Sequence, residues 1–336
     1  MSDIKRKLAS VQVIEKLSSI KNADNIETAD VLGWHVVVKK GEFKVGDRCV
    51  YVEIDSILPS DNPAFSFMTN RNYKVKTVKL RGQISQGICF PLDILPDGEY
   101  NIGQDVTDIL GIKKFELNSP KVGDKIASEN KGLFPSFLVK TDEIRAQSIP
   151  DIVKSLENTK MYITEKLDGS SITIYTKDHD FGVCSRRYEK RIDDDNIFTK
   201  TALKYKEIIK SLNMNIAFQG ELVGPKIQSN RLKFKENDIY FFNVYDINSG
   251  EFYDFENMLS ILSEIKLKVV PIVEYNFILN HTIDELVNLS IGKSLINSKI
   301  YREGIVIRSK KEMYIDKLGR CSFKVINPKY LLKYDE

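Results

Sequence analysis

The sequence predicts an α+β protein: a small β-barrel in the first third, then a larger domain of antiparallel sheets with flanking helices. Two observations lead to this prediction. Residues 8–112 form short β-rich runs that are separated by turns and show little helical periodicity. From residue 160 onward, strand-like segments alternate with amphipathic helical ones, as in folds where helices pack on sheets.

Length and composition limit the class of protein. The chain has 336 residues, enough for two domains, and 42% of them are hydrophobic, so a sizeable core is available. The formal net charge is only +3, which argues against a polycationic nucleic-acid protein. Any nucleic-acid binding must therefore come from local patches.

The cysteines, histidines and termini bear on compartment and metals. Four cysteines and three histidines are scattered, without a Cys-x-x-Cys pair, so neither a zinc site nor a disulfide framework is expected. The N-terminus lacks an apolar signal segment, and no run approaches 18 apolar residues. We expect a cytoplasmic or nuclear protein, neither secreted nor membrane-bound, and a monomer.

The first domain, predicted over residues 1–118, has the size and strand spacing of an OB-fold. Two β-rich runs, 34–38 and 48–54, flank a Lys/Gly segment, and two more lie around 82–87, a spacing typical of small closed barrels. Trp34 is expected in the barrel core. One β-rich stretch carries four basic residues that form either a solvated strand face or a surface along an RNA backbone. They are Lys74, Lys76, Lys79 and Arg81.

Residues 119–132 are predicted to be a linker, and residues 133–336 the second domain. A helix is expected within 141–156, where Thr-Asp-Glu precedes apolar residues at helical spacing around a proline. Further helices are expected at 195–212, 255–265 and 282–291. The strands between them are expected in one large sheet, at 161–166, 171–176, 181–186, 216–224, 238–247, 303–309, 313–317 and 321–326.

One β-rich region is interrupted by the sequence Lys166-Leu-Asp-Gly-Ser-Ser171. Asp-Gly is a strong hairpin signal, so turn chemistry alone can account for it. Other strand-like stretches, however, also carry charged or aromatic residues that a plain strand does not need. They are SRR at 185–187, GELVG at 220–224, YFFNVYD at 240–246, EGIVIR at 303–308 and FKVINP at 323–328. Each alone fits a surface charge, but together and in this order they indicate one site.

In this order the stretches resemble the motifs of the covalent nucleotidyltransferase superfamily, which contains ATP-dependent ligases and mRNA capping enzymes. Its members carry K-x-D-G, S-R, a Glu-bearing strand, an aromatic-Asp strand, E-G-[IV]-[IV] and a Lys-bearing last strand. The resemblance covers roughly residues 130–336. It implies an adenylyltransferase domain that uses ATP and Mg²⁺ or Mn²⁺.

The order of the domains narrows this resemblance. DNA ligases and capping enzymes place an OB domain after the last motif, whereas here a barrel comes first and the chain ends 12 residues past Lys324. Segments 20–52, 134–147 and 220–230 look like the fifth RNA ligase family. That implies sealing of 3′-OH and 5′-phosphate RNA ends through lysyl-AMP and adenylylated-RNA intermediates, with nicked duplex RNA as the partner, in RNA repair.

The resemblance also implies roles for individual residues. Lys166 is the nucleophile, which requires that its ordinary pKa of about 10.4 be offset by positive neighbours or burial. The catalytic set adds Glu221, Glu303 and the α-phosphate ligand Lys324, and the metal carboxylates are Asp168, Glu221 and Glu303. The nucleotide contacts are Glu165 at the adenine edge, Arg186 at ribose, Tyr245 stacked on adenine, Ser171 at ribose or phosphate, and Lys329 at phosphate or RNA.

Some positions depart from the pattern or stay open. Many ligases have a second lysine where this chain has Ile326, and Lys329 is out of register for the same strand face, so the α-phosphate role falls to Lys324 alone. Arg145 and Lys140 are candidates for pyrophosphate or the RNA 5′-phosphate. Phe242 is expected in the core rather than on a base.

Two alternatives to RNA ligation remain. One is a DNA ligase or a GTP-dependent capping enzyme, against which the missing C-terminal OB domain counts. The other is a catalytically inactive RNA-binding OB protein, against which the intact Lys166, Glu221, Glu303 and Lys324 count.

Overall fold

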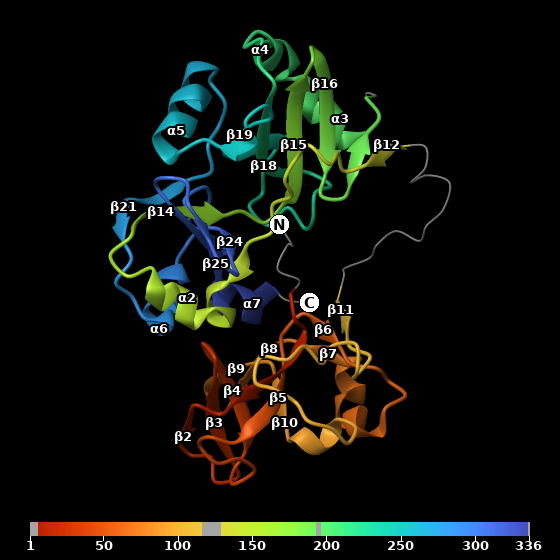
Figure 1. Ribbon diagram of the computed structural model, residues 1–336, viewed down its shortest axis with the longest axis vertical. Helices are drawn as coiled ribbons and strands as arrows, with labels where there is room; N and C mark the ends of the chain where they lie inside the picture. Colours follow the sequence, from red (N-terminus) through yellow and green to blue (C-terminus); the bar gives the residue numbers. More distant parts are fainter. Residues whose placement is uncertain (1–5, 116–128, 193–195, 335–336) are drawn as a thin grey trace.

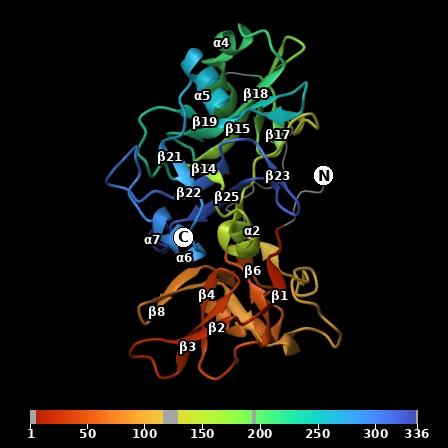
Figure 2. The ribbon, with the colours of Figure 1, turned by 60° about the vertical axis from the view of Figure 1, so that its left-hand side comes forward.

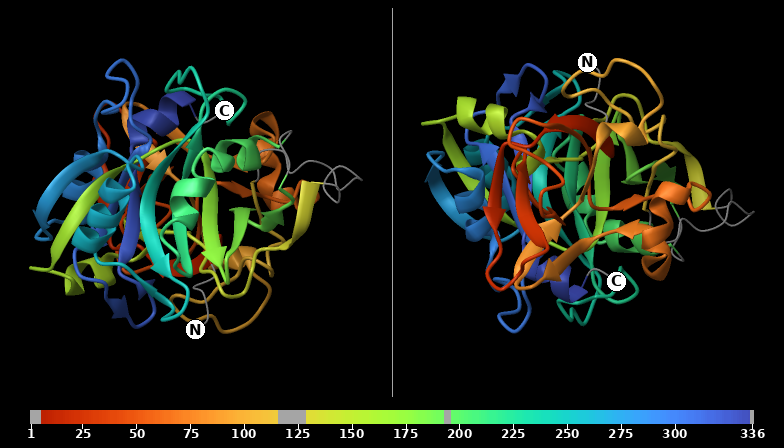
Figure 3. Two further views of the ribbon diagram at one scale, coloured as in Figure 1. Left: turned by 90° about the horizontal axis from the view of Figure 1, so that it is seen from above. Right: turned by 90° about the horizontal axis from the view of Figure 1, so that it is seen from below.

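A barrel-like domain and a larger two-sheet domain make up the computed structural model, which describes residues 6–115, 129–192 and 196–334 (Figure 1). In the views from above and below, the barrel covers one end of the larger domain (Figure 3). Residues 119–128 of the predicted linker lie outside the described residues, and residues 130–132 belong to a strand of the larger domain. No helix of the described residues is long and apolar enough to cross a membrane.

The barrel-like domain consists of short antiparallel strands whose side chains alternate between core and solvent. In β4 (Trp34–Lys39), for example, Trp34, Val36 and Val38 are buried while their neighbours are not. The first sheet contains β1 (Ala9–Val13), β5 (Arg48–Val52) and β10 (Ile88–Phe90); the second contains β2 (Lys16–Ser19), β3 (Ile26–Val31) and β4. The third contains β11 (Lys113–Lys114), β6 (Ser56–Ile57) and β7 (Lys74–Val75), and β8 (Thr77–Leu80) pairs with β9 (Gln83–Gln86).

These strands, with the short helices η1 (Pro63–Arg71) and η2 (Leu92–Ile94), enclose one core. Strand β4 contacts both β9 and β10, which joins the small sheets around it. The expectation for Trp34 is confirmed, because its side chain is 1% exposed and packs 6.2 Å from the Tyr51 ring. An OB-fold barrel is therefore present at the N-terminal end.

The β-rich stretch that carries the four basic residues is divided between two strand pairs. Lys74 lies in β7 and pairs with Ile57, whereas Lys79 lies in β8 and pairs with Ile84, so the chain changes sheet between them. The ammonium of Lys74 sits 3.9 Å from the centre of the Phe115 ring. Strand β8, in contrast, contacts the C-terminal helix of the larger domain.

The larger domain has two mostly antiparallel sheets rather than the one that the strand pattern suggested. The seven-stranded sheet runs in the order β12 (Asn130–Leu133), β17 (Tyr188–Lys190), β16 (Asp180–Ser185), β15 (Ser170–Lys177), β18 (Ile216–Val223), β19 (Asp238–Asp246), β20 (Glu251–Phe252). The five-stranded sheet runs β13 (Ile144–Arg145), β25 (Ser322–Ile326), β22 (Gly304–Ser309), β14 (Lys160–Lys166), β21 (Ile272–Ile278), and only its β13–β25 pair is parallel. Strands β23 (Tyr314–Ile315) and β24 (Gly319–Arg320) form a separate hairpin.

Helices cover both sheets. Helices α3 (Ile197–Leu203), α4 (Lys206–Lys210) and α5 (Phe255–Glu264) pack on the seven-stranded sheet through a core that includes Phe218 and Phe241. Helices α2 (Pro150–Ser155) and α6 (Ile283–Ser290) pack on the five-stranded sheet around Phe323. Helix α7 (Pro328–Tyr334) ends the described chain, and α2, α6 and α7 lie toward the barrel (Figure 2).

Two expected helices differ from the structure. The segment 141–149 is not α-helical: Ile144 and Arg145 form β13, and after the short helix η3 (Ala146–Ser148) an α-helix starts only at Pro150. Proline disfavours helical backbone in the residue before it. The residues of β13 pair with strand β25 instead of joining the helix. The helix expected at 195–212 is split into α3 and α4, where Tyr205 packs edge-on against Phe241 and bonds to Asp238.

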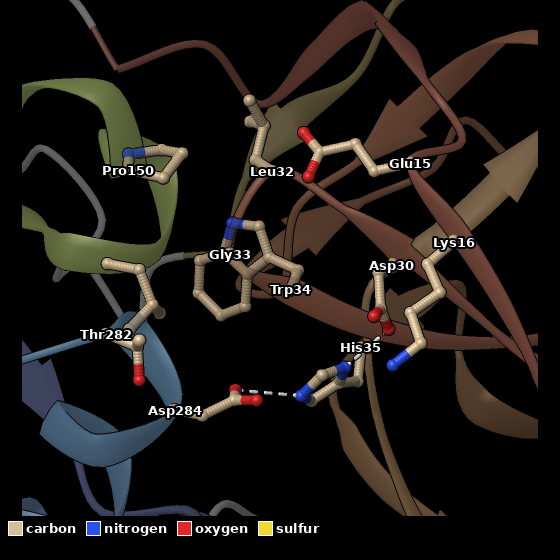
Figure 4. Close-up of a pocket in the computed structure, with 11 residues that line it drawn as sticks. Glu15, Lys16, Asp30, Leu32, Gly33, Trp34, His35, Pro150, Thr282 and Asp284 are labelled. Atoms are coloured by element: carbon tan, nitrogen blue, oxygen red, sulfur yellow. Dashed lines mark hydrogen bonds and ion pairs between the residues drawn. The ribbon is translucent and has the colours of Figure 1, made fainter. Parts of the chain in front are cut away.

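The two domains share an apolar and hydrogen-bonded interface. Ile326 and Leu331 of the larger domain belong to the barrel core, and the amide N–H of Gly33 donates to the carbonyl of Gln147 at 2.9 Å. A Cβ on Gly33 would lie 2.8 Å from the Gln147 Cα, so this approach requires glycine. Beside it, a pocket of about 340 Å³ contains His35, which bridges Asp30 of the barrel and Asp284 of α6 (Figure 4).

Candidate active site

The lysine of the Lys-x-Asp-Gly turn ends strand β14, opposite Gly304 at the start of β22. Its Nζ lies 2.7 Å from Glu303 Oε1, and both side chains are largely buried. Burial favours the neutral amine, but the carboxylates of Glu303, Glu221 and Asp168 outweigh it and raise the pKa of Lys166. In this state the lysine is charged, so becoming a nucleophile requires that these carboxylates be neutralised.

The second carboxylate, Glu221, is brought in by strand β18. Glu221 pairs with Ser171 of β15, directly after the turn. Burial, together with the charges of Glu303 and Asp168, raises the pKa of Glu221 to about 8, although Lys166 opposes this shift. A Cβ on Gly169 would lie 2.4 Å from the Leu222 carbonyl oxygen and 2.8 Å from Glu221 Cγ. Glycine is therefore needed here for space, so that the turn can approach Glu221.

Asp168 is held by two groups that the sequence did not single out. Arg231 Nη1 donates to Asp168 Oδ2 at 3.0 Å, and the Tyr330 hydroxyl donates to the same oxygen at 2.8 Å. Arg231 comes from the loop after β18, and Tyr330 from α7. A buried carboxylate of this kind needs paired donors, so these contacts fix the turn that carries Lys166.

Lys324 lies in the same sheet as Lys166, between two strands. It pairs with Arg145 of β13 on one side and Val306 of β22 on the other. Its Nζ lies 3.5 Å from Asp142 Oδ1, and the other oxygen of Asp142 accepts a bond from Arg186. Burial and the positive charges of Lys166 and Arg145 lower the pKa of Lys324 to about 8, against the pull of Asp142. The structure thus brings Arg186 and Lys324 to one acidic side chain.

A buried ion pair beneath this lysine was missed from the sequence. Arg308 Nη2 donates to Glu143 Oε1 at 2.7 Å, and the Arg308 side chain is almost fully buried. Against the effect of burial, Arg308 and Lys324 lower the pKa of Glu143 to about 2. The signal that could have found it is the charged last-but-one residue of a strand whose other members are all apolar or small.

Ile326 explains the departure from the Lys-x-Lys pattern. Its side chain is 5% exposed and belongs to the core of the barrel domain. A lysine at this position would bury its charge between the domains, which is costly without a partner. In this chain an apolar side chain therefore serves domain docking at the expected position of the second lysine.

Three of the remaining nucleotide candidates, Glu165, Ser171 and Lys329, lie close in sequence or contact to the turn at 166–169. Glu165 is 2% exposed; its Oε2 accepts a 2.7 Å bond from the Leu295 amide, and its Oε1 has no partner. The Ser171 hydroxyl lies 3.3 Å from that of Thr141. Lys329 is exposed on α7, directly before Tyr330, the residue that bonds to Asp168.

The structure does not bring Tyr245 to the lysine. Tyr245 is buried with Leu138 and Phe252, five residues along β19 from Tyr240, the partner of Glu221. At about 3.3 Å per residue, this separates it from that row by roughly 16 Å. Phe242 lies instead among the side chains packed against the cluster that contains Leu167, the residue after Lys166. Its ring centre is 5.3 Å from the Arg308 guanidinium.

Arg145 connects the site to the barrel. Its Nη2 donates to Asp55 Oδ2 of the barrel at 2.6 Å, while its Nε and Nη1 are buried without a partner. Lys140 is exposed, with its ammonium 5.9 Å from the Phe134 ring centre. Of the two, Arg145 has unsatisfied donors beside Lys324, and such buried donors call for an acceptor.

The donor set fits a divalent ion that is held through water. Among the described ranges 6–115, 129–192 and 196–334, no three His, Cys, Asp or Glu side chains are grouped to ligate one metal directly. However, Glu303 Oε2 is buried without a partner, and burial raises the pKa values of both Glu221 and Glu303. Hard oxygen ligands whose charges repel one another suit Mg²⁺ or Mn²⁺ that keeps its waters.

Known families match both parts of the chain. A family model described as an OB-fold domain matches residues 8–92, and one described as RNA ligase matches residues 159–326. No match was found among curated proteins.

Solved structures of Naegleria gruberi RNA ligase are similar over nearly the whole chain. A lysine-to-alanine mutant with ATP and Mn is 36% identical, with a TM-score of 0.88 over 98% of this chain and 99% of that one. A glutamate-to-alanine mutant with ATP and Mn is 36% identical, with a TM-score of 0.89 over 98% and 100%. The enzyme with PPi is 37% identical, with a TM-score of 0.88 over 98% and 99%.

Proposed function

The chain belongs to the RNA ligase family and is an ATP-dependent RNA ligase, and we propose that it seals 3′-OH and 5′-phosphate ends at nicks in RNA duplexes. Lys166 attacks the α-phosphate of ATP, forming an N–P bond and releasing pyrophosphate. The AMP then passes to the RNA 5′-phosphate, and the 3′-OH displaces AMP to form the phosphodiester. The observation that carries this proposal is the hydrogen bond from Lys166 to Glu303, with the carboxylates of Glu221 and Asp168 also close enough to raise the pKa of the lysine.

Activation of the nucleophile follows from those charges. While Lys166 Nζ donates a hydrogen bond to Glu303, Lys166 remains an ammonium with a raised pKa. A divalent ion held by Glu221 and Glu303 through water would offset the carboxylates and the phosphate charge. Glu303, which already bonds to the lysine, can then accept its proton, because burial raises the pKa of Glu303. We assign Asp168 to fixing the turn rather than to the metal, because Arg231 and Tyr330 occupy it.

The phosphates are assigned to the cationic end of the five-stranded sheet. Lys324, whose pKa is lowered to about 8, is still mostly charged at pH 7, and a bound anion would favour the charged form further, so this side chain suits the α-phosphate. The free donors of Arg145 suit the leaving pyrophosphate. Arg186 is assigned to the ribose, and Ser171 to ribose or phosphate, with Lys329 as a further contact to phosphate or RNA.

The adenine is assigned to the buried surface beside Lys166. Phe242 replaces Tyr245 as the aromatic group that contacts the base, because it packs against the cluster that contains Leu167, the residue after Lys166. The unpartnered Oε1 of Glu165 is an acceptor suited to the exocyclic amine of adenine, which guanine lacks at that position.

The setting of the reaction is proposed on similar grounds. The domain division is 1–118 for the OB-fold and 133–336 for the adenylyltransferase domain, which extends back to Asn130 because β12 belongs to its seven-stranded sheet and shortens the linker accordingly. A barrel next to the site enlarges the surface that can contact RNA. This favours a nicked duplex, which extends to both sides of the reacting ends, over one single-stranded end. We place the protein in the cytoplasm or nucleus as a monomer acting in RNA repair.

Two measurements test this function. Incubation with α-labelled ATP or GTP, followed by denaturing electrophoresis, should label the protein with ATP alone. Sealing of nicked RNA should exceed sealing of single-stranded RNA and of nicked DNA. Labelling by GTP would support a capping enzyme, preference for DNA would support a DNA ligase, and absence of label would support an inactive binding protein.

A further inference from the structure

Three segments of the larger domain meet beside the nucleophile turn: the loop 225–237, the loop 291–301 and helix α7. The Asn297 amide donates to the Leu232 carbonyl at 3.2 Å, and Arg231 Nη2 donates to the Tyr334 carbonyl at 3.0 Å. The Lys333 ammonium lies 5.7 Å from the ring centre of Tyr301. These contacts join the segments into one continuous surface.

The surface concentrates positive charge. The three segments together carry eight lysines and arginines but one glutamate, whereas the whole chain has a net charge of only +3. The remainder of the chain is therefore negative on balance. All seven lysines of these segments are exposed, so phosphate groups can reach them, and four of them are spread over the two loops and the helix: Lys233, Lys293, Lys299 and Lys333.

Half-exposed tyrosine rings lie among these cations. Lys293 Nζ is 4.0 Å from the Tyr301 ring centre, and Lys333 Nζ is 5.1 Å from that of Tyr334. A lysine above a ring keeps its ammonium hydrogens available to phosphate oxygens. Cations interleaved with aromatic rings are typical of surfaces that bind a nucleic-acid strand through backbone charge and stacking.

The position of the surface connects it to the reaction. Arg231 bonds to Asp168 of the turn, and Tyr301 lies two residues before Glu303, the partner of Lys166. Helix α7 also contacts strand β8 of the barrel, as Figure 1 shows, and exposed Lys79 and Arg81 lie on that β8–β9 hairpin. The positive surface therefore extends from the active site onto the barrel.

We propose that this tyrosine–lysine surface (Lys233, Lys293, Lys299, Tyr301, Lys333 and Tyr334), continued by Lys79 and Arg81, holds the RNA backbone next to Lys166. The inference rests on the proposed sealing of RNA ends. It names residues of both domains that would contact the RNA. The contact between α7 and β8 would make their basic residues one continuous RNA-binding surface. RNA fits better than an acidic protein because the surface leads to the lysine that must meet a 5′-phosphate.

The test replaces Lys233, Lys293, Lys299 and Lys333 together with glutamine in the full-length chain. The matched control changes Lys200, Lys210 and Lys266 to glutamine; these exposed residues lie near α3, α4 and α5, at the far end of the domain in Figure 1. Three quantities are measured: adenylylation without RNA, binding of a nicked RNA duplex across salt concentrations, and single-turnover sealing. Circular dichroism and thermal unfolding check the fold.

We expect unchanged adenylylation but at least tenfold weaker binding and sealing at physiological salt in the surface variant, with the control near wild type. The salt slope should fall by about 0.7–0.9 for each phosphate contact that is lost. Adding Lys79→Gln and Arg81→Gln should weaken sealing further. Wild-type binding and sealing in the surface variant, as an acidic protein partner would give, overturns the inference, and so does an equal loss in the control or a loss of adenylylation. If the wild type itself seals no RNA, the proposed function fails instead.

Discussion

At the scale of single residues, the pKa values in the site depend on neighbouring charges as well as on burial. Lys166 is the clearest case, because the carboxylates around it keep it charged despite its enclosure. Substituting Lys166 with alanine should abolish both the labelled covalent adduct and the sealing of 5′-phosphate RNA. Sealing of RNA that has been adenylylated chemically should persist, because that step bypasses the lysine. An AMP adduct on the Lys166→Ala protein would disprove the assignment.

The two buried glutamates should behave alike. Changing either Glu221 or Glu303 to glutamine keeps the shape but removes a charge needed to hold a divalent ion. We expect adenylylation to fall by about 10²–10⁴-fold at saturating Mg²⁺, a loss of several kcal/mol of transition-state stabilisation. Near-normal rates in both variants would contradict this role. Glu274, exposed on β21, provides a control position for the same substitution.

Arg231 should act through Asp168 on the lysine. Replacing Arg231 with methionine leaves the Asp168 charge without its guanidinium partner, and this charge raises the pKa of Lys166. A higher pKa lowers the fraction of neutral amine, so adenylylation at pH 7 should decrease and recover as the pH rises. The pH–rate profile should shift to higher pH, and Arg231→Lys should restore part of it. A uniform loss at every pH would mean that Arg231 is merely structural.

At the scale of elements, strand β25 serves both the site and the docking of the barrel. Lys324 belongs to the candidate active site and pairs with Arg145, whereas Ile326, two residues later in the strand, packs into the barrel core. Ile326→Lys should therefore destabilise the protein by at least about 2 kcal/mol without increasing adenylylation. Thermal unfolding and single-turnover labelling measure both effects, with Ile326→Val as the apolar control. Faster adenylylation by the lysine variant would show that the position still belongs to the phosphate site.

At the scale of the whole molecule, His35 couples domain docking to pH. Burial opposes its charge, but Asp30 and Asp284 raise the pKa of His35 above its ordinary value near 6.5. Their contribution is therefore complete below that value and is lost as pH rises through the raised pKa. Glu15 and Lys16 line the same pocket.

The corresponding experiment compares thermal unfolding of the wild type and His35→Gln between pH 6 and pH 9. The wild type should be more stable by roughly 1–3 °C at the acid end, and the difference should vanish at the alkaline end. Asp284→Asn should reduce this difference but not abolish it, because Asp30 makes the larger contribution to the raised pKa of His35. In the His35→Gln background, Asp284→Asn should leave the pH dependence unchanged. A pH-independent difference would show that the ion pair does not contribute.

The sequence by itself determined the domain order, most strands and the main residues of the candidate site. Lys166, Glu221, Glu303 and Lys324 were predicted because each stands in a strand-like stretch with a charged residue out of place, and because the order of these stretches resembles the superfamily motifs. The barrel and its buried Trp34 followed from the same alternation.

Only the tertiary structure decided which distant residues meet. Tyr245 and Phe242 share one strand, but Tyr245 is buried with Leu138 and Phe252, whereas Phe242 packs against the cluster that contains Leu167. Arg231 and Tyr330 reach Asp168 from 63 and 162 residues away in the chain. Local periodicity records which face of a strand is buried, but not which other segment covers it, because that depends on pairings between sheets and domains.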